Sequence, residues 1–172
     1  DLVRAELVFR RGTPPDATYS FKHALVRDTA YNCMLKSQRV LRHRQIAAAL
    51  EKPDRAAPAA QPELLAYHHQ EGGNAAAALH YWQAAGEQAI ARSAVREAVT
   101  HYQALLALNP QDNQGARYSL LNLLLEADRE ADAAALLKQF KDGMAEWRYT
   151  GALLAFRKSG ASPAAERRLA AA

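Results

Sequence analysis

Apolar residues recur every three or four positions through most of this chain, with short polar turns between the apolar stretches. From residue 62 onward this period predicts helices at about 62–71, 75–92, 94–108, 114–127, 132–140 and 163–172. The clearest apolar face lies in 94–108 and comprises Val95, Ala98, Val99, Tyr102, Leu105 and Leu106. Pro62 suits a first helical position, and Gly72-Gly73-Asn74 is typical of a turn. The pattern therefore predicts an all-α body.

The first 51 residues show a different pattern. Leu7 and Phe9 alternate with polar neighbours, residues 11–16 have turn composition, and Tyr19 and Phe21 alternate again. This predicts a short β-hairpin. Because a two-stranded ribbon is marginal alone, we expect it to lie on the next helix, at about 23–35. The apolar side of that helix would be Leu25, Ala30, Cys33 and Met34.

A second helix is expected at about 37–51, with Ser37 as its cap. Its apolar positions are Val40, Ile46, Ala47 and Leu50. Residues 52–61, with two prolines, form an expected linker. The predicted organisation is thus 1–51, a linker at 52–61, and helical repeats at 62–172.

Composition and charge narrow the function classes. The chain of 172 residues is 49% apolar and carries a net charge of +4, and the whole excess lies in residues 1–51. A balanced remainder offers no continuous field for phosphate, so we expect no nucleic-acid partner for the whole chain. No apolar run is long enough to span a membrane, and no signal peptide is evident. Because the chain lacks an initiator Met, we expect it to be an internal fragment. Its single cysteine, Cys33, cannot form an intrachain disulfide and suits a reducing compartment, so we expect a cytoplasmic location.

The stretch 75–110 resembles a tetratricopeptide repeat, a helical hairpin of about 34 residues. With Pro110 as the closing proline, the matching positions are Trp82, Gly86, Ala98, Tyr102 and Pro110. In such a hairpin Trp fills the gap between helices, while Gly and Ala allow close approach of their backbones. Trp147 and Gly151 repeat the spacing of Trp82 and Gly86 further along. We therefore expect an α-solenoid of tetratricopeptide-like hairpins, ending in a polar cap at 163–172. The phase of the repeats stays open.

Two further stretches resemble bacterial multidomain regulators, namely class III adenylate or guanylate cyclases and related proteins with a signalling P-loop ATPase module. They are YSFKHALVRDTAY at 19–31, and PELLAYHH at 62–69 followed by ALHYWQAAG at 78–86. Residues 108–118 are more similar to another group of bacterial tetratricopeptide proteins. The resemblance implies that 1–51 is the edge of an upstream winged-helix module. It also implies a sensing or docking role for the repeats.

Neither nucleotide chemistry nor another catalytic constellation is expected within these residues. None of the eight glycines stands before Lys-Ser or Lys-Thr, so no loop can hold a triphosphate. His68, His69 and His80 lack the spacing of a metal site, and Cys33 lacks partners for nucleophilic chemistry. We expect no cofactor and no metal.

Two surfaces remain as candidates. The face expected to line the groove of the repeats comprises His80, Gln83, Glu87, Tyr118, Asn122 and Arg148. A basic docking face comprises Lys36, Arg39, Arg42 and Arg44, together with His43. The favoured hypothesis is a non-catalytic scaffold module that binds a protein, a peptide or an upstream domain of the same polypeptide. The alternatives are nucleic-acid binding by helix 36–44 and, third, an enzyme.

Overall fold

The computed structural model describes residues 2–14, 17–52, 61–140 and 142–172. Its two strands are β1 (Val8–Arg11) and β2 (Thr18–Phe21), and they form an antiparallel hairpin. The helices are α1 (Ala24–Asn32), α2 (Lys36–Leu50), α3 (Pro62–Glu71), α4 (Ala75–Ala91), α5 (Val95–Leu108), α6 (Ala116–Glu126), α7 (Glu130–Gln139), α8 (Ala145–Ser159) and α9 (Pro163–Ala170). A mostly helical chain with a short N-terminal hairpin is therefore confirmed.

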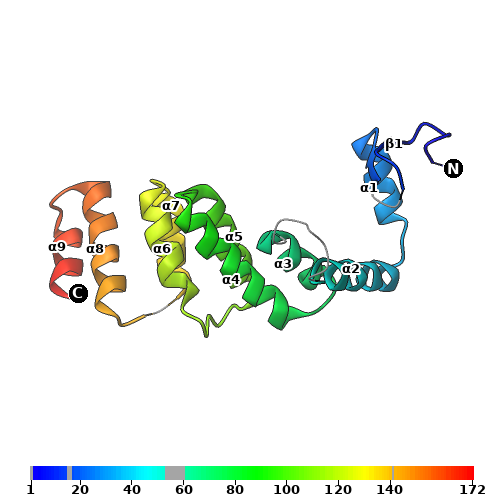
Figure 1. Ribbon diagram of the computed structural model, residues 1–172. Helices are drawn as coiled ribbons and strands as arrows, with labels where there is room; N and C mark the ends of the chain where they lie inside the picture. Colours follow the sequence, from blue (N-terminus) through cyan, green and yellow to red (C-terminus); the bar gives the residue numbers. More distant parts are fainter. Residues whose placement is uncertain (1, 15–16, 53–60, 141) are drawn as a thin grey trace.

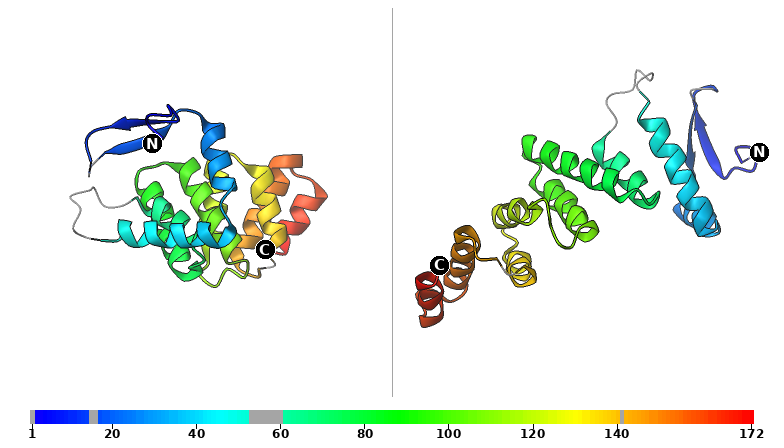
Figure 2. Two further views of the ribbon diagram at one scale, coloured as in Figure 1. Left: turned by 90° about the vertical axis from the view of Figure 1, so that its right-hand side faces the viewer. Right: turned by 90° about the horizontal axis from the view of Figure 1, so that it is seen from below.

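The helices follow one another in a row. From α2 to α9 each helix packs against the next one along the chain. Figure 1 shows the hairpin and α1 at one end of this row and α8 with α9 at the other. The right-hand view of Figure 2 shows the same elongated arrangement from below, and its left-hand view looks along the row. The packing of α2 on α3 crosses the expected boundary between 1–51 and the repeats, and the linker prediction falls largely on 53–60, outside the described residues.

The apolar core lies in the middle of the row. Its largest fully buried side chains are Val99 and Leu105 on α5 and Leu121 and Leu124 on α6. The core continues into α7 and reaches Trp147 and Leu154 on α8. Helix α6 contacts helices on two sides, which explains why its leucines occupy nearly its whole circumference.

Local signals define several helix ends. Pro62 and Pro163 stand in the first turns of α3 and α9, where a missing N–H costs nothing. Gly73 has a φ of +76° in the turn before α4, and the side chain of Asn74 accepts a hydrogen bond from the Ala77 N–H at 3.2 Å. The expected cap at Ser37 is wrong, because α2 begins at Lys36 and Ser37 lies within its first turn.

The expected support for the hairpin is found only in part. Val8 of β1 is 7% exposed and α1 contacts β2, but the rings of Phe9 and Tyr19 are not covered. The register pairs Phe9 with Ser20 and Tyr19 with Arg10, so Phe9 and Tyr19 lie on opposite faces of the ribbon. Both aromatic rings are exposed, and helix α1 buries none of its residues, Leu25 being 80% exposed. A single nine-residue helix cannot cover two apolar faces. The turn expected at 11–16 includes residues 15 and 16, which lie outside the described ranges.

The expected polar cap at the other end is found only in part. Glu166, Arg167 and Arg168 are exposed, but Leu169 is exposed as well. Leu169 and Phe156 line an apolar groove of about 450 Å³ between α8 and α9. On a helix of eight residues the charges cover only part of the circumference, so this side stays apolar. None of the helices described here has both the length and the apolar character needed to cross a membrane.

Candidate protein-binding surface

The repeat-signature residues of α4 and α5 lie together. A Cβ atom added to Gly86 would lie 2.7 Å from Cε2 of Tyr102, so only glycine allows this ring to lie on the α4 backbone. Ala98 is fully buried, and Pro110 follows the end of α5. Trp82 is half-buried, stacks on His101 with 5.5 Å between ring centroids, and donates a hydrogen bond from Nε1 to Oε1 of Gln70 at 3.0 Å. Trp82 thus connects α3, α4 and α5.

The second Trp and Gly pair occupies a different environment. Trp147 is 5% exposed, and its Nε1 donates to the backbone oxygen of Phe140 at 2.9 Å. A Cβ atom on Gly151 would meet only Cδ1 of Leu137, at an ordinary 3.9 Å. The tryptophan is therefore held in the core, whereas the glycine is not required by a close contact.

The six residues of the expected binding face lie on alternate helices. His80, Gln83 and Glu87 are exposed on α4, and the Gln83 amide donates to the Glu87 carboxylate at 2.9 Å. On α6 the exposed Asn122 donates to Glu146 at 3.1 Å, which connects it to α8. Within the described residues, no hydrogen bond joins the α4 group to the α6 group. The α4 residues of the face thus lie beside one another, but in the described part of the chain no hydrogen bond, ion pair or ring contact of these side chains connects them to the residues on α6.

Arg148 and Tyr118 have intramolecular partners. Arg148 on α8 donates from Nη1 to the backbone oxygen of Ala171 at 3.1 Å and remains exposed. Tyr118 on α6 is half-buried, and its hydroxyl donates to the carboxylate of Asp142. Of the six candidates, Tyr118 is the least exposed, and its hydroxyl is bonded to Asp142.

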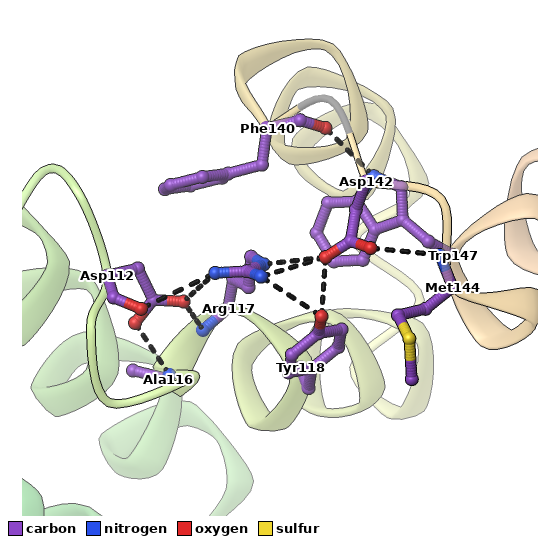
Figure 3. Close-up of polar contacts among 8 residues, drawn as sticks. All are labelled: Asp112, Ala116, Arg117, Tyr118, Phe140, Asp142, Met144 and Trp147. Carbon is purple, nitrogen blue, oxygen red and sulfur yellow. Dashed lines mark hydrogen bonds and ion pairs between the residues drawn. The ribbon is translucent and has the colours of Figure 1, made fainter.

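The hydroxyl of Tyr118 belongs to a network centred on Arg117. The Arg117 guanidinium lies between Asp112 and Asp142, as Figure 3 shows, with Nη1 to Oδ2 of Asp112 at 2.9 Å and Nη2 to Oδ2 of Asp142 at 2.8 Å. Asp112 also accepts from the backbone N–H groups of Ala116 at 2.7 Å and Arg117 at 3.1 Å. The network therefore ties the α5–α6 turn, the start of α6 and the α7–α8 turn to one another.

The network shifts the pKa values of its members. Hydrogen bonds from Tyr118, the Met144 N–H and Arg117 lower the pKa of Asp142 to about 2. The same carboxylate raises the pKa values of Arg117 and Tyr118. All three groups thus keep their usual charge states at neutral pH, and the arrangement provides anchoring rather than proton transfer.

Sequence reasoning missed this network. Its one local signal is Asp112, an acidic residue shortly before α6, which satisfies N–H groups that the helix itself cannot. The φ of +51° at Asp112 is a conformation that Asp tolerates better than most residues. Asp142 lies 25 positions beyond Arg117, so no short motif connects them.

Two cations of the expected basic docking face, Arg39 and Arg44, make contacts within the chain. The Arg44 guanidinium donates from Nε to the Gly72 backbone oxygen at 2.6 Å, and Arg39 lies over the Tyr31 ring at 5.2 Å. His43 is buried, not part of an exposed face, because α3 packs against that side of α2. Lys36, Arg42 and Arg44 are exposed, and Arg39 is half-buried. Of the five residues expected on this face, only His43 is therefore removed from it by burial.

Histidines on α2 and α3 contact other aromatic rings. Nδ1 of His43 lies 2.9 Å from Nδ1 of His68, and His69 stacks on Tyr81 with 5.4 Å between centroids. Among the residues that the structure describes, no group of three His, Cys, Asp or Glu side chains could hold a metal ion. Cys33 is exposed, which differs from the buried position expected for it.

Comparisons with known proteins add one relative. No protein-family model matches the chain, and no solved structure matches it. The chain is similar to an uncharacterized protein of Rhizobium meliloti (strain 1021), with 31% identity over 123 residues. The match covers 72% of this chain and 12% of that protein. The chain thus spans about an eighth of the length of this relative.

Proposed function

We propose that this chain is a non-catalytic protein-binding module, a tetratricopeptide-like α-solenoid within a cytoplasmic bacterial signalling protein. The observation that carries the proposal is the contact of Tyr102 with Gly86, at two positions of the repeat signature. The row of helices, each packed on its chain neighbours, is the arrangement that such repeats share. Stacked hairpins of this kind leave one set of helix faces free for a partner segment.

The proposed binding face is the one formed by His80, Gln83, Glu87, Tyr118, Asn122 and Arg148. Support comes from exposure, since all of these except the half-buried Tyr118 are exposed. They also lie on α4, α6 and α8, which alternate along the row, and they offer donors and acceptors of both kinds.

We further propose that residues 1–51 complete a neighbouring module of winged-helix type in the same polypeptide. The exposed rings of Phe9 and Tyr19 on opposite faces of the hairpin support this, because large apolar side chains are usually covered by a partner. Any cyclase or ATPase activity would then belong to modules outside these residues. The short match to a much longer relative is compatible with a role as one part of a large chain.

Site-specific photocrosslinking in cells tests the binding face. A photoreactive amino acid at Gln83 or Asn122 is expected to give a defined adduct with one partner protein. The matched controls are Gln103 and Gln139, which are also exposed amides but lie on the intervening helices α5 and α7. Equal adducts at all four positions would contradict the assignment of the face, and so would the absence of adducts at Gln83 and Asn122.

A turnover assay tests the non-catalytic part of the proposal. The purified chain is expected to hydrolyse neither ATP nor GTP above the buffer rate. Hydrolysis that disappears on substitution of one of its own residues would refute this part, whereas hydrolysis that survives every substitution indicates a contaminant.

A further inference from the structure

A second candidate surface lies away from the α4 part of the proposed face. Helices α7, α8 and α9 border an open groove of about 1060 Å³. Helix α8 contributes the largest number of lining residues, while α7 and α9 contribute to its two sides. Figure 1 shows α8 and α9 as a pair at the end of the row, next to α6 and α7.

Every charged residue that lines the groove is a cation. They are Lys138 on α7, Arg148 and Lys158 on α8, and Arg168 on α9. In the described part of the chain, no carboxylate lies within ion-pair distance of these four side chains, whereas Arg157, beside Lys158, pairs with Glu130 at 3.1 Å. Four cations around one groove without a counter-charge give it a positive potential.

Two of these cations are oriented by backbone oxygens. Arg168 donates from Nη1 to the Gly151 oxygen at 3.3 Å, and Arg148 donates from Nη1 to the Ala171 oxygen at 3.1 Å. Each guanidinium has five N–H donors, so most remain available to a ligand. Such oriented guanidiniums suit carboxylates, which they can bind in pairs of hydrogen bonds.

Between the cations the groove is apolar. Leu137, Trp147 and Leu154 line it together with the small residues Gly151 and Ala155. Small residues let another helix approach closely. Arg148 and Lys158 are ten positions apart on α8, which corresponds to roughly 15 Å along a helix axis. The groove can therefore contact about three turns of a helix.

We propose that this groove binds an acidic amphipathic helix of a partner protein. Apolar side chains of that helix would contact Leu137, Gly151 and Ala155, which are partly exposed, while the nearly buried Trp147 and Leu154 form the floor of the groove. Its Asp or Glu residues would pair with the four cations. The apolar lining favours a peptide over a nucleic-acid backbone, which offers no apolar stripe. This inference adds the chemistry of a partner to the proposed function. It rests on that function in one respect, because it too treats the chain as a binding module.

Fluorescence anisotropy with a designed probe tests the proposal on the whole chain. The probe is a labelled 14-residue helical peptide with a Leu stripe at i, i+3 and i+4 spacing and Glu at its flanks. It is expected to bind, and a version with Lys in place of every Glu is expected not to. The variant K158E/R168E should weaken binding at least about tenfold. The control R10E/R96E carries the same change in net charge outside the groove and should retain binding within about twofold.

Three outcomes would overturn the inference. The first is no binding of the Glu peptide, and the second is an equal loss of binding in K158E/R168E and R10E/R96E. The third is a single-stranded DNA of matched charge that binds as tightly as the peptide. Circular dichroism confirms that both variants stay helical, which is expected because all four substituted side chains are exposed. Crosslinks at Gln83 and Asn122 report on the proposed function separately, so either proposal can fail while the other stands.

Discussion

In α4 and α5 the ring of Tyr102 lies directly on Gly86, whereas in α8 and α9 the corresponding Gly151 borders an open groove. Both helix pairs carry the same spacing of Trp and Gly. The difference lies in the second helix of each pair. Twenty positions after Trp82 stands Tyr102, and twenty after Trp147 stands Arg167, which is exposed. No aromatic ring stands at the corresponding position, and Gly151 lines an open groove that α7 also borders.

The two tryptophans also differ in what they connect. Trp82 connects α3 to α5 through Gln70 and His101. Trp147 contacts the Tyr118 ring of α6, with 5.8 Å between centroids, and bonds to the Phe140 oxygen. Both tryptophans thus connect neighbouring helices, but through different partners. A repeat signature sets where helices lie, but the side chains of the next helix decide whether their interface closes.

Truncation of a core leucine should show the largest difference between the two regions. Leu105 on α5 is 0% exposed, and L105A is expected to cost about 2–5 kcal/mol of unfolding free energy through lost burial and a cavity. Leu153 on α8 is 40% exposed, and L153A should cost under about 1 kcal/mol. Urea unfolding followed by circular dichroism measures both. Equal costs would show that α8 is packed as tightly as α5.

Alanine at the two glycines should give effects of opposite sign. In G86A the new methyl group meets the buried Tyr102 ring, and we expect destabilisation by about 1–3 kcal/mol. In G151A the methyl group finds ordinary space, so the better helix propensity of Ala should stabilise the chain by about 0.5–1 kcal/mol. Thermal unfolding of the two variants checks this pair, and destabilisation by G151A would mean that the groove closes in solution.

Loss of Asp112 should loosen the joint between the two regions. D112A removes the acceptor for the Ala116 and Arg117 N–H groups and should cost about 0.5–2 kcal/mol. D132A, which breaks an exposed pair with Arg129, should cost at most about 1 kcal/mol. Hydrogen exchange followed by mass spectrometry should show faster exchange in α6 and α8 than in α4. Uniform acceleration along the chain would contradict a local role.

Acidification should affect the contact of α2 with α3 and the joint between α6 and α8 at different pH values. Burial lowers the pKa of His68, and the neighbouring His43 and His69 lower it further. As the pH falls below about 6.5, the unfolded chain binds a proton that the folded chain resists, so packing of α2 on α3 weakens. Asp142, with its pKa of about 2 against an ordinary 3.8, stabilises above about pH 4 and loses this contribution only as the pH falls towards 2.

Peptide-resolved hydrogen exchange between pH 7 and 2.5 can separate these two steps. We expect faster opening of α3 first, after correction for the intrinsic pH dependence of exchange, and of the α6–α8 joint later. H68Q should remove the first step and D142N the second. The reverse order would contradict the assignment of these groups.

Part of the candidate site was accessible from sequence. The period of apolar residues located every helix except α8 to within a few positions, and no helix was predicted over 145–159. The signature residues identified α4 and α5 as a pair that Gly86 allows to approach closely. The Arg117 network and the cationic groove were not accessible, because their members lie on several elements separated by 20 to 30 positions. No local spacing relates Lys138 to Arg168.

The sequence by itself determined the hairpin, the order of the elements and all helices except α8, since these follow from local period, turn residues and prolines. Only the tertiary structure decided that α2 packs across the expected boundary, that Phe9 and Tyr19 of the hairpin stay exposed, and that α7 to α9 leave a groove. The physical reason is that an interface depends on the shapes of two surfaces at once. Each helix encodes its own face, but whether a space is filled depends on the side chains that a distant segment brings to it.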